Sequence, residues 1–284
     1  MTAAPGGVLY VVATPIGNLE DITLRALRVL AEVTLIAAED TRTIRHLLEH
    51  HRIEAPKIVS YFQGNEAARC DDLVGRVAGG ERIALVSEAG MPGISDPGER
   101  VIARMREAGL RVEVLPGAAA VVTALVGSGL PTTRFVFVGF PPRAVGERQA
   151  LFASLRNEPG TIVLYEAPGR VGATLADLAA TLGPDRRAEV ARELTKIFEE
   201  RVAGTLAVLS ERFADTAPRG ECVIMVAGAV EGATAIPIDI EADVRARLSR
   251  GESCKEIAAA LALLTGRKRR EIYQLAIAIR GSEG

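Results

Sequence analysis

Tryptophan is absent from the 284-residue chain, and aromatic residues make up only 4% of it. This scarcity argues against a nucleic-acid site built mainly from aromatic side chains on which bases stack. Cysteine is scarce as well, because Cys70, Cys222 and Cys254 stand alone and form no C-x-x-C pair. Three isolated cysteines support neither a disulfide framework nor a zinc cluster, and they fit a reducing cytoplasm.

Two nucleotide-binding signatures are also missing. No Gly-x-Gly-x-x-Gly follows the first apolar run, and no P-loop ends in Gly-Lys-Ser/Thr, which argues against an NAD dehydrogenase or a nucleotide phosphatase. The N-terminus lacks the pattern of a signal peptide. The longest mostly apolar stretch, residues 118–130, is too short to span a bilayer, which needs about 20 residues. We therefore expect a cytoplasmic protein without a membrane partner.

The remaining composition is that of a soluble globular protein. Hydrophobic residues make up 48% and charged residues 25%, and the formal net charge is −2. Bulk charge therefore does not indicate nucleic-acid binding, and a basic surface would have to be local. The length suits about two domains.

Apolar runs of strand length alternate with helical patterns along most of the chain, which predicts βαβ units and mostly parallel sheets. We expect an N-terminal α/β domain over residues 1–130 and a second α/β domain over residues 131–235. Residues 236–284 show only helical patterns and predict a small helical extension. Strands are predicted at residues 8–13, 34–38, 57–61, 82–86, 111–115, 135–139, 161–165, 188–192 and 221–226. We also expect residues 135–140 to be a core strand, and residues 196–201 to be either functional or a charged surface turn.

A long loop rich in glycine and proline, residues 87–98, follows the predicted strand 82–86. Ligands of open α/β sheets bind beyond the carboxyl ends of the strands, so this loop is the first candidate for a binding site. Three more such loops follow strands, at residues 14–18, 116–120 and 139–142. Together they are expected to wall a binding cleft.

Six segments occur in an order that resembles the ribosomal-RNA 2′-O-methyltransferases of the tetrapyrrole methylase superfamily. They are residues 13–23 (ATPIGNLEDIT), 38–42 (AEDTR), 87–98 (SEAGMPGISDPG), 115–117 (LPG), 165–170 (YEAPGR) and 192–196 (RELTK). The resemblance implies two α/β/α domains with a cleft between them that binds S-adenosylmethionine. It further implies a homodimer that methylates the 2′-oxygen of a cytidine in the decoding region of 16S rRNA, within the small ribosomal subunit.

The expected reaction requires help for the nucleophile, because a ribose 2′-hydroxyl reacts poorly unless its proton is removed or strongly hydrogen-bonded. The candidate catalytic residues are Asp40, Arg42, Lys196 and Glu199. Either Asp40 or a deprotonated Lys196 would be the base, and the cations would position a phosphate or the hydroxyl. The alternative is that Asp40 caps a helix and forms a local ion pair with Arg42.

The resemblance also implies the residues that contact the cofactor, which are Pro15, Gly90, Met91, Pro92, Gly93, Ile94, Ser95, Pro116, Gly117, Ala119, Ala120, Tyr165, Val223 and Ile224. Two residues of the 87–98 loop depart from the family pattern. Glu88 stands where the family commonly has Asp, and Met91 stands where it has Thr or Ser. Ser95 and Asp96 either contact ligand or cap the helix expected to begin at Pro97.

The helical extension contains four consecutive basic residues, Arg267, Lys268, Arg269 and Arg270, at the start of a predicted helix. Positive charge at a helix N-terminus opposes the helix dipole, so a phosphate partner is expected there. Arg143 is a further candidate RNA contact. Ser253 and Glu256 have the spacing of a capping box, and Gly266 is expected to turn the chain into the last helix.

His46 and His50 have the i, i+4 spacing of metal ligands, but no Glu or Cys completes a set, so we expect no metal site. Two other functions remain open on the same fold. One is a C-methyltransferase that acts on a tetrapyrrole, and the other is a non-catalytic RNA-binding assembly factor that keeps the cleft.

Overall fold

The computed structural model describes residues 6–229, 240–265 and 267–282. Contacts divide the chain into two compact units. The first unit comprises Met1–Ser128, Ala191–Arg201 and Arg219–Val223, and the second comprises Gly129–Val190, Val202–Pro218 and Ile224–Gly284. The border that the sequence predicts at residues 235 and 236 lies outside the described residues.

The first unit is built on a five-stranded sheet in the order β3-β2-β4-β1-β5, and its strand pairs are parallel. The sequence predicted these strands to within one residue at either end. Their bounds are Val8–Val12 (β1), Leu35–Ala38 (β2), Lys57–Ser60 (β3), Arg82–Val86 (β4) and Arg111–Leu115 (β5). The helices between and after them are η1 (Leu19–Asp21), α1 (Leu24–Glu32), α2 (Thr41–His50), α3 (Glu66–Ala78), α4 (Glu99–Glu107) and α5 (Ala120–Gly127).

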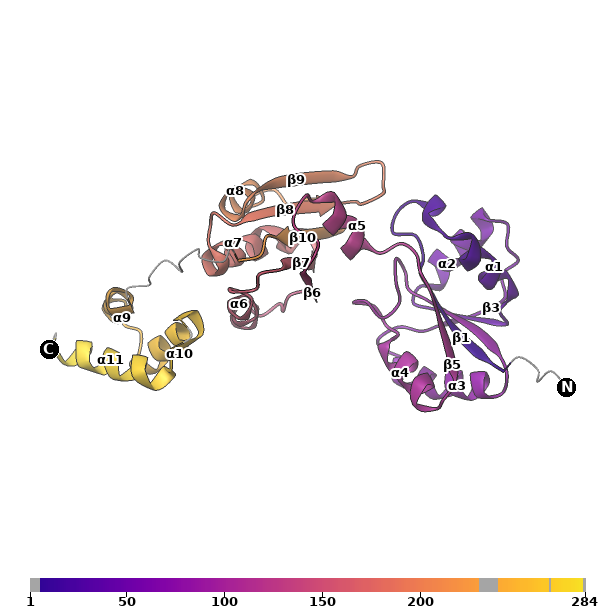
Figure 1. The fold of residues 1–284 in the computed structure, drawn as a ribbon, viewed down its shortest axis with the longest axis horizontal. Helices are drawn as coiled ribbons and strands as arrows, with labels where there is room; N and C mark the ends of the chain where they lie inside the picture. The colour runs from indigo at the N-terminus through magenta and orange to yellow at the C-terminus, as the bar shows by residue number, and fades with distance from the viewer. Residues whose placement is uncertain (1–5, 230–239, 266, 283–284) are drawn as a thin grey trace. The chain divides into compact units, whose positions relative to one another are not determined.

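Both faces of this sheet are covered because side chains alternate along each strand. Tyr10 and Val12 of β1 pack with α1 and α2 on one face, whereas Leu9 and Val11 pack with α3 and α4 on the other. Figure 1 shows the first unit with α1 and α2 on one side of the strands and α3 on the opposite side. The first unit is therefore an α/β/α layer structure with a parallel sheet, as the resemblance implies.

The second sheet has the order β6-β7-β10-β8-β9, with β6 and β7 parallel. Its strands are β6 (Phe135–Gly139), β7 (Thr161–Glu166), β8 (Arg187–Arg192), β9 (Glu200–Thr205) and β10 (Cys222–Val226). The helices that accompany them are α6 (Val145–Ser154), η2 (Pro168–Arg170), α7 (Val171–Leu182) and α8 (Leu206–Arg212). The mainly apolar segments of β7 and β10 lie side by side within the sheet and are almost entirely buried.

Two expectations for this sheet are wrong. The sequence predicts no strand at residues 200–205, yet β9 forms there, because an edge strand needs a neighbour on one side only and its side chains stay half-buried or exposed. Residues 135–140 are not core, because β6 is the other edge strand, with Phe135 40% and Phe140 57% exposed.

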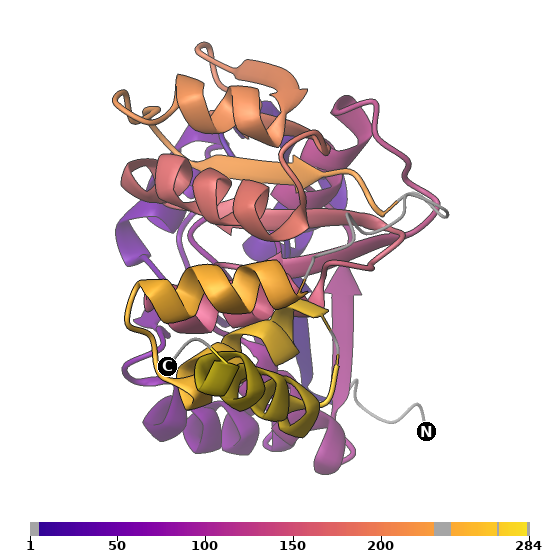
Figure 2. The same cartoon turned by 90° about the vertical axis from the view of Figure 1, so that its left-hand side faces the viewer.

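The tail consists of the three helices α9 (Ile240–Ser249), α10 (Cys254–Thr265) and α11 (Arg269–Ser282), which contact one another as Figure 2 shows. They have a core of their own that includes Val244, Ile257 and Ile272. The predicted capping box is confirmed, since the Glu256 carboxylate accepts the N–H of Ser253 at 3.0 Å and the Ser253 hydroxyl accepts the N–H of Glu256 at 3.3 Å. The predicted turn at Gly266 lies outside the described residues.

In the part of the chain that the structure describes, no helix has the length and apolar character needed to cross a membrane.

Candidate active site

The loops that follow β1 and β4 are fastened to each other. Thr14 and Gly90 exchange backbone hydrogen bonds of 2.9 and 3.0 Å, and the Ser87 hydroxyl donates to the carbonyl of Gly90 at 3.1 Å. Gly90 has φ +84°, and an added Cβ would lie 3.3 Å from the Ile16 side chain, so glycine suits this close approach. The segment 13–23, which we call the first motif, and the 87–98 loop therefore form one structure at the carboxyl edge of the first sheet.

The far end of the 87–98 loop is anchored to α3. The Glu66 carboxylate accepts the N–H of Gly98 at 3.1 Å and the hydroxyl of the buried Tyr61 at 2.8 Å. Gly98 is the N-cap of α4 and no side chain caps it, so neither Ser95 nor Asp96 is the cap. Ser95 has φ +65°, a strained conformation for a non-glycine residue, which is typical of functional loops.

Asp96 is surrounded by acidic groups. Burial raises the pKa of its carboxyl to about 7, and the charge of Glu39 adds to the rise. The Ser87 hydroxyl lowers the pKa, whereas the charges of Glu88 and Glu221 raise it. A carboxyl with such a pKa titrates near neutrality.

The pKa of Asp96 leads to a prediction about stability. Because the folded pKa lies above the ordinary 3.8, the folded state holds the Asp96 proton more tightly, and its stability falls as pH rises from about 4 to about 7. The Asp96→Asn variant lacks this decline, so its stability relative to wild type is expected to be greater at pH 8 than at pH 5. Urea unfolding at both pH values measures the difference. Asp71→Asn, on an exposed aspartate, is the control, and equal pH dependence in D96N and wild type would refute the assignment.

Asp40 forms the N-cap of α2 and is clamped by Arg42. Its carboxylate accepts the backbone N–H of Arg42 at 2.7 Å and the guanidinium NH2 at 2.6 Å. These hydrogen bonds hold the pKa of Asp40 well below its usual range. The Arg42 side chain is otherwise 87% exposed. The cap and the ion pair exist as the alternative interpretation predicts, and they leave the cation open to an external anion.

Lys196 lies in the turn between β8 and β9, where its ammonium group donates to Glu193 at 2.9 Å and to Glu221 at 3.1 Å. Burial lowers the pKa of Lys196, but the hydrogen bonds and the negative charges of Glu193 and Glu221 together raise the pKa above its ordinary value. Of the two roles expected for Lys196, the geometry therefore favours the cation over the deprotonated base. The first motif lies against this turn, since a Cβ on Gly17 would lie 2.5 Å from the Lys196 side chain.

Glu199 holds the same turn in shape. Its carboxylate accepts the N–H of Thr195 at 2.7 Å and pairs with Arg201 at 3.0 Å, and the Thr195 hydrogen bond lowers its pKa. Arg201 continues to α5, where it donates to the carbonyls of Ala124 and Thr123 at 3.2 and 3.3 Å. Glu199 thus connects the turn to α5.

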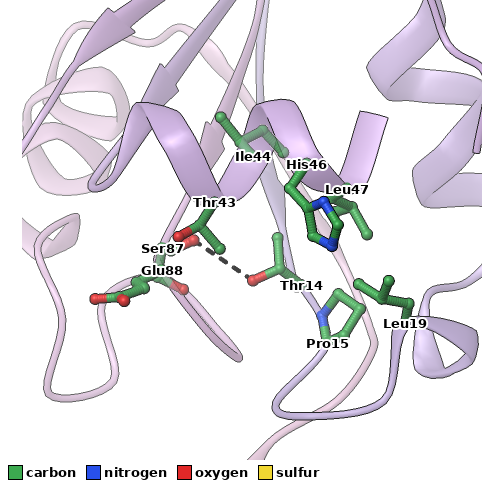
Figure 3. A pocket seen from close by; sticks show the side chains of 9 residues that line it. All are labelled: Thr14, Pro15, Leu19, Thr43, Ile44, His46, Leu47, Ser87 and Glu88. Carbon is green, nitrogen blue, oxygen red and sulfur yellow. Dashed lines mark hydrogen bonds between the residues drawn. The ribbon is translucent and has the colours of Figure 1, made fainter. Parts of the chain in front are cut away.

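A pocket of about 60 Å³ opens at this edge of the first unit. Figure 3 shows Thr14 near its middle, its hydroxyl directed to Ser87, with the His46 ring reaching from α2 toward Leu19 and Pro15. Among the described residues, no three His, Cys, Asp or Glu side chains gather in a metal-binding arrangement. His46 is a pocket residue, whereas His51 contacts the carbonyl of Leu19 at 3.3 Å.

The candidate cofactor residues of the first unit differ in exposure. Pro116, Gly117, Ile94 and Ser95 are exposed, Gly90 and Pro92 are buried, and the Met91 side chain packs against the core between the sheet, α3 and α4. This packing explains why an apolar residue is suited to position 91, where the family commonly has Thr or Ser. Val223 belongs to the first unit and Ile224 to the second. The side chains of both are buried in β10, so these two residues can offer a ligand only their backbone.

The remaining candidates lie in the second unit. Tyr165 is half-buried at the end of β7, and Arg143 is exposed in the loop before α6. Arg267, Lys268, Arg269 and Arg270 are all exposed, and the last two begin α11.

Sequence reasoning did not single out Glu193, Glu221 and Arg201 as site residues, and it gave Asp96 only as a ligand contact or a helix cap. Glu193 belongs to the RELTK segment, and its φ of +52° marks a tight turn, but its partner Glu221 follows 28 residues later. The two meet because β8 and β10 are neighbours in the second sheet, and the N–H of Glu193 donates to the carbonyl of Glu221 at 3.1 Å.

Residues 8–210 match the model of the family Tetrapyrrole (Corrin/Porphyrin) Methylases. A protein of Synechocystis sp. named ribosomal RNA small subunit methyltransferase I is 44% identical over 95% of this chain and 98% of its own length. A protein of the same name from Pseudomonas aeruginosa is 42% identical over 97% of this chain and 98% of its own length.

Solved structures share the fold. A uroporphyrin-III C-methyltransferase from Thermus thermophilus, complexed with S-adenosylhomocysteine, has a TM-score of 0.55 and 22% identity over 78% of this chain and 97% of that one. A diphthine synthase has a TM-score of 0.59 and 16% identity over 78% of this chain and 90% of that one. The chain therefore belongs to the tetrapyrrole methylase family and, within it, to the group whose curated members are named ribosomal RNA small subunit methyltransferase I.

Proposed function

We propose that this chain is an S-adenosylmethionine-dependent methyltransferase that methylates the 2′-hydroxyl of a cytidine in the decoding region of 16S rRNA, within the small ribosomal subunit. One observation carries the proposal. The family motifs at residues 13–23, 38–42, 87–98 and 192–196 meet at one edge of the first sheet. Hydrogen bonds and ion pairs fix the acidic and basic side chains of these motifs in place. Relatives that match almost the whole chain bear the corresponding name.

The first unit fits S-adenosylmethionine on its own features. The loop after β5 is made of small residues, and Gly117 packs so closely on Ala13 that a Cβ would lie 2.8 Å from the Ala13 Cβ. The N-cap of α5 is Ala119, and no side chain bonds to the helix N–H groups there, so they can serve a ligand. The exposed Ile94 offers an apolar wall. We propose that the cofactor residues expected from the sequence bind mainly through backbone groups.

When bound, S-adenosylmethionine supplies a methyl group on a sulfonium centre. The residues of this chain act on the ribose hydroxyl. The Lys196 ammonium group has three N–H donors and uses two on Glu193 and Glu221, so the third can hold the 2′-oxygen and stabilise negative charge on it. An RNA phosphate that binds Arg42 removes hydrogen bonds from Asp40, whose pKa then rises, and Asp40 accepts the hydroxyl proton.

The proposed setting is the cytoplasm, with the chain as a homodimer. Three apolar side chains of the first unit support association, since Val114 on the edge strand β5 and Val122 and Val126 on α5 are 54%, 45% and 75% exposed.

We propose that the tail contacts RNA phosphates. Replacing Arg269 and Arg270 with Gln is expected to weaken binding to small subunits and to reduce the slope of log affinity against log salt by about 1.5, because fewer counterions are released. The control removes the same charge from exposed tail positions outside the basic run, Lys255 and Arg280. Binding titrations at salt concentrations from about 50 to about 200 mM measure this slope for both double variants. If the two double variants have the same slope, the basic run does not bind phosphate.

The competing function is methylation of a tetrapyrrole, because solved neighbours of this fold include a uroporphyrin-III C-methyltransferase. Purified protein with methyl-labelled S-adenosylmethionine is offered small subunits from a strain that lacks the modification and, separately, uroporphyrinogen. Label is expected in the RNA alone. Label in the tetrapyrrole alone would refute the proposal, and RNA binding without any label would indicate a non-catalytic assembly factor.

A further inference from the structure

Phe140 presents an exposed but supported ring at the end of β6. Its side chain is 57% exposed, and its ring meets that of Tyr165 edge to face with 5.6 Å between centroids. Tyr165 is supported in turn by Phe137, at 4.8 Å. Edge-to-face contacts of this kind hold aromatic rings in place. One side of the Phe140 ring is therefore fixed against the protein while the rest faces solvent.

A buried carboxylate, Glu166, follows Tyr165 in the chain. Glu166, 1% exposed, accepts the Thr174 hydroxyl at 2.6 Å and the N–H of Ala167 at 2.9 Å, and its remaining contact is the Arg170 guanidinium at 3.4 Å. A buried charge is costly unless it is paired and hydrogen-bonded, and Glu166 is both. Glu166 thereby fixes the position of Arg170.

The guanidinium group of Arg170 also binds the loop that follows Phe140. Its NH2 group donates to the carbonyls of Pro141 and Pro142 at 2.8 and 3.0 Å. Proline has a restricted φ, so this loop has few conformations available, and the two hydrogen bonds from Arg170 fix its position. The chain from Glu166 through Arg170 to Pro141 and Pro142, which we call the Glu166–Arg170 latch, preorganises the Phe140 ring.

We propose that Phe140 stacks on a nucleobase of the RNA substrate, with Glu166 and Arg170 as positioning residues. This inference rests on the proposed function and specifies how its substrate is held. Unpaired RNA bases are bound by stacking on aromatic rings, and a nearby cation binds the adjoining phosphate. Arg143, three residues from Phe140, is exposed and has no acidic partner among the described residues. S-adenosylmethionine carries no phosphate, so a ring three residues from this cation in the chain suits RNA better than the adenine of the cofactor.

The test compares Phe140→Ala with Phe135→Ala, which removes an exposed ring from the other end of the same strand. Two affinities are measured for each variant: for small subunits that lack the modification, and for S-adenosylmethionine by calorimetry. F140A is expected to lose about tenfold in subunit affinity. F140Y should keep that affinity, and cofactor affinity should change less than twofold. Subunit affinity in F140A equal to that in F135A would overturn the inference, as would a loss confined to the cofactor.

The latch is tested through Arg170→Met, with Arg170→Lys as the conservative variant. R170M should raise the KM for subunits by about the factor seen in F140A while kcat changes little, and R170K should restore part of the affinity. Adding F140A to R170M should then cost little more, because both act on the same ring. Additive losses, or a fall in kcat alone, would overturn the positioning role. A wild-type protein that methylates no RNA would instead refute the proposed function itself.

Discussion

The Lys196→Met variant is expected to transfer methyl groups about 10²-fold more slowly than wild type in a single turnover, since removing one preorganised donor costs that much in comparable sites. The ammonium group lies between Glu193 and Glu221, at 2.9 and 3.1 Å. Its removal eliminates the donor that we assign to the 2′-oxygen. It also leaves two carboxylates without their cation, which repel the charge that develops on that oxygen.

Rapid mixing of saturating variant with labelled cofactor and unmodified subunits measures this rate. Lys57→Met removes an exposed lysine of the same unit and should leave the rate unchanged. Lys196→Arg retains the charge with a different geometry, and an intermediate rate is expected. A K196M rate within about threefold of wild type, far from the loss expected for a lost donor, would remove Lys196 from the catalytic residues.

The Arg148→Met variant is expected to destabilise the second unit by about 3–5 kcal/mol, because it leaves a largely buried carboxylate without its cation. Arg148 on α6 donates its Nε to Asp177 on α7 at 2.8 Å, and the two side chains are only 7% and 15% exposed. Gln149 donates to the same carboxylate at 3.0 Å. The pair therefore joins two helices of the second unit at one point.

Urea unfolding of R148M, Q149A and wild type tests this prediction. Gln149→Ala removes one hydrogen bond and should cost about 1 kcal/mol. The double variant R148M/D177L, which removes both charges, should recover most of the loss, because a buried ion pair is often replaceable by apolar side chains. A cost below about 1 kcal/mol for R148M would contradict the prediction, since it would match the loss of one hydrogen bond.

The first sheet was predictable because its strands are short apolar runs that end in turn residues. The inner strands β1, β2 and β4 are such runs and are almost entirely buried, and β4 was found with its correct bounds from Arg82 to Val86. β9 escaped because Glu200, Arg201 and Gly204 lower its apolar content, and an edge strand does not need a continuous apolar run. The exposed position of β6 was not predicted for the opposite reason. Its residues are apolar, and only the strand order reveals that it lies at an edge.

The candidate site was predictable where a motif is continuous in the chain. Asp40 and Arg42 are two residues apart, and their cap and ion pair follow from that spacing. The site was not predictable where partners are remote, as for Lys196 and Glu221, because their contact depends on β8 and β10 being neighbours. The low aromatic content argues against a surface of many stacked rings, yet one supported ring, Phe140, still suits a single base.

The most direct test of RNA methylation at this site is nucleoside analysis of the product. Small subunits that lack the modification are incubated with wild-type protein and methyl-labelled S-adenosylmethionine, and the RNA is then digested and separated by chromatography. The proposed function predicts that the label elutes as 2′-O-methylcytidine and that Asp40→Asn greatly slows its appearance. Label in a base-methylated nucleoside, or no label from folded protein that binds the cofactor, would contradict it.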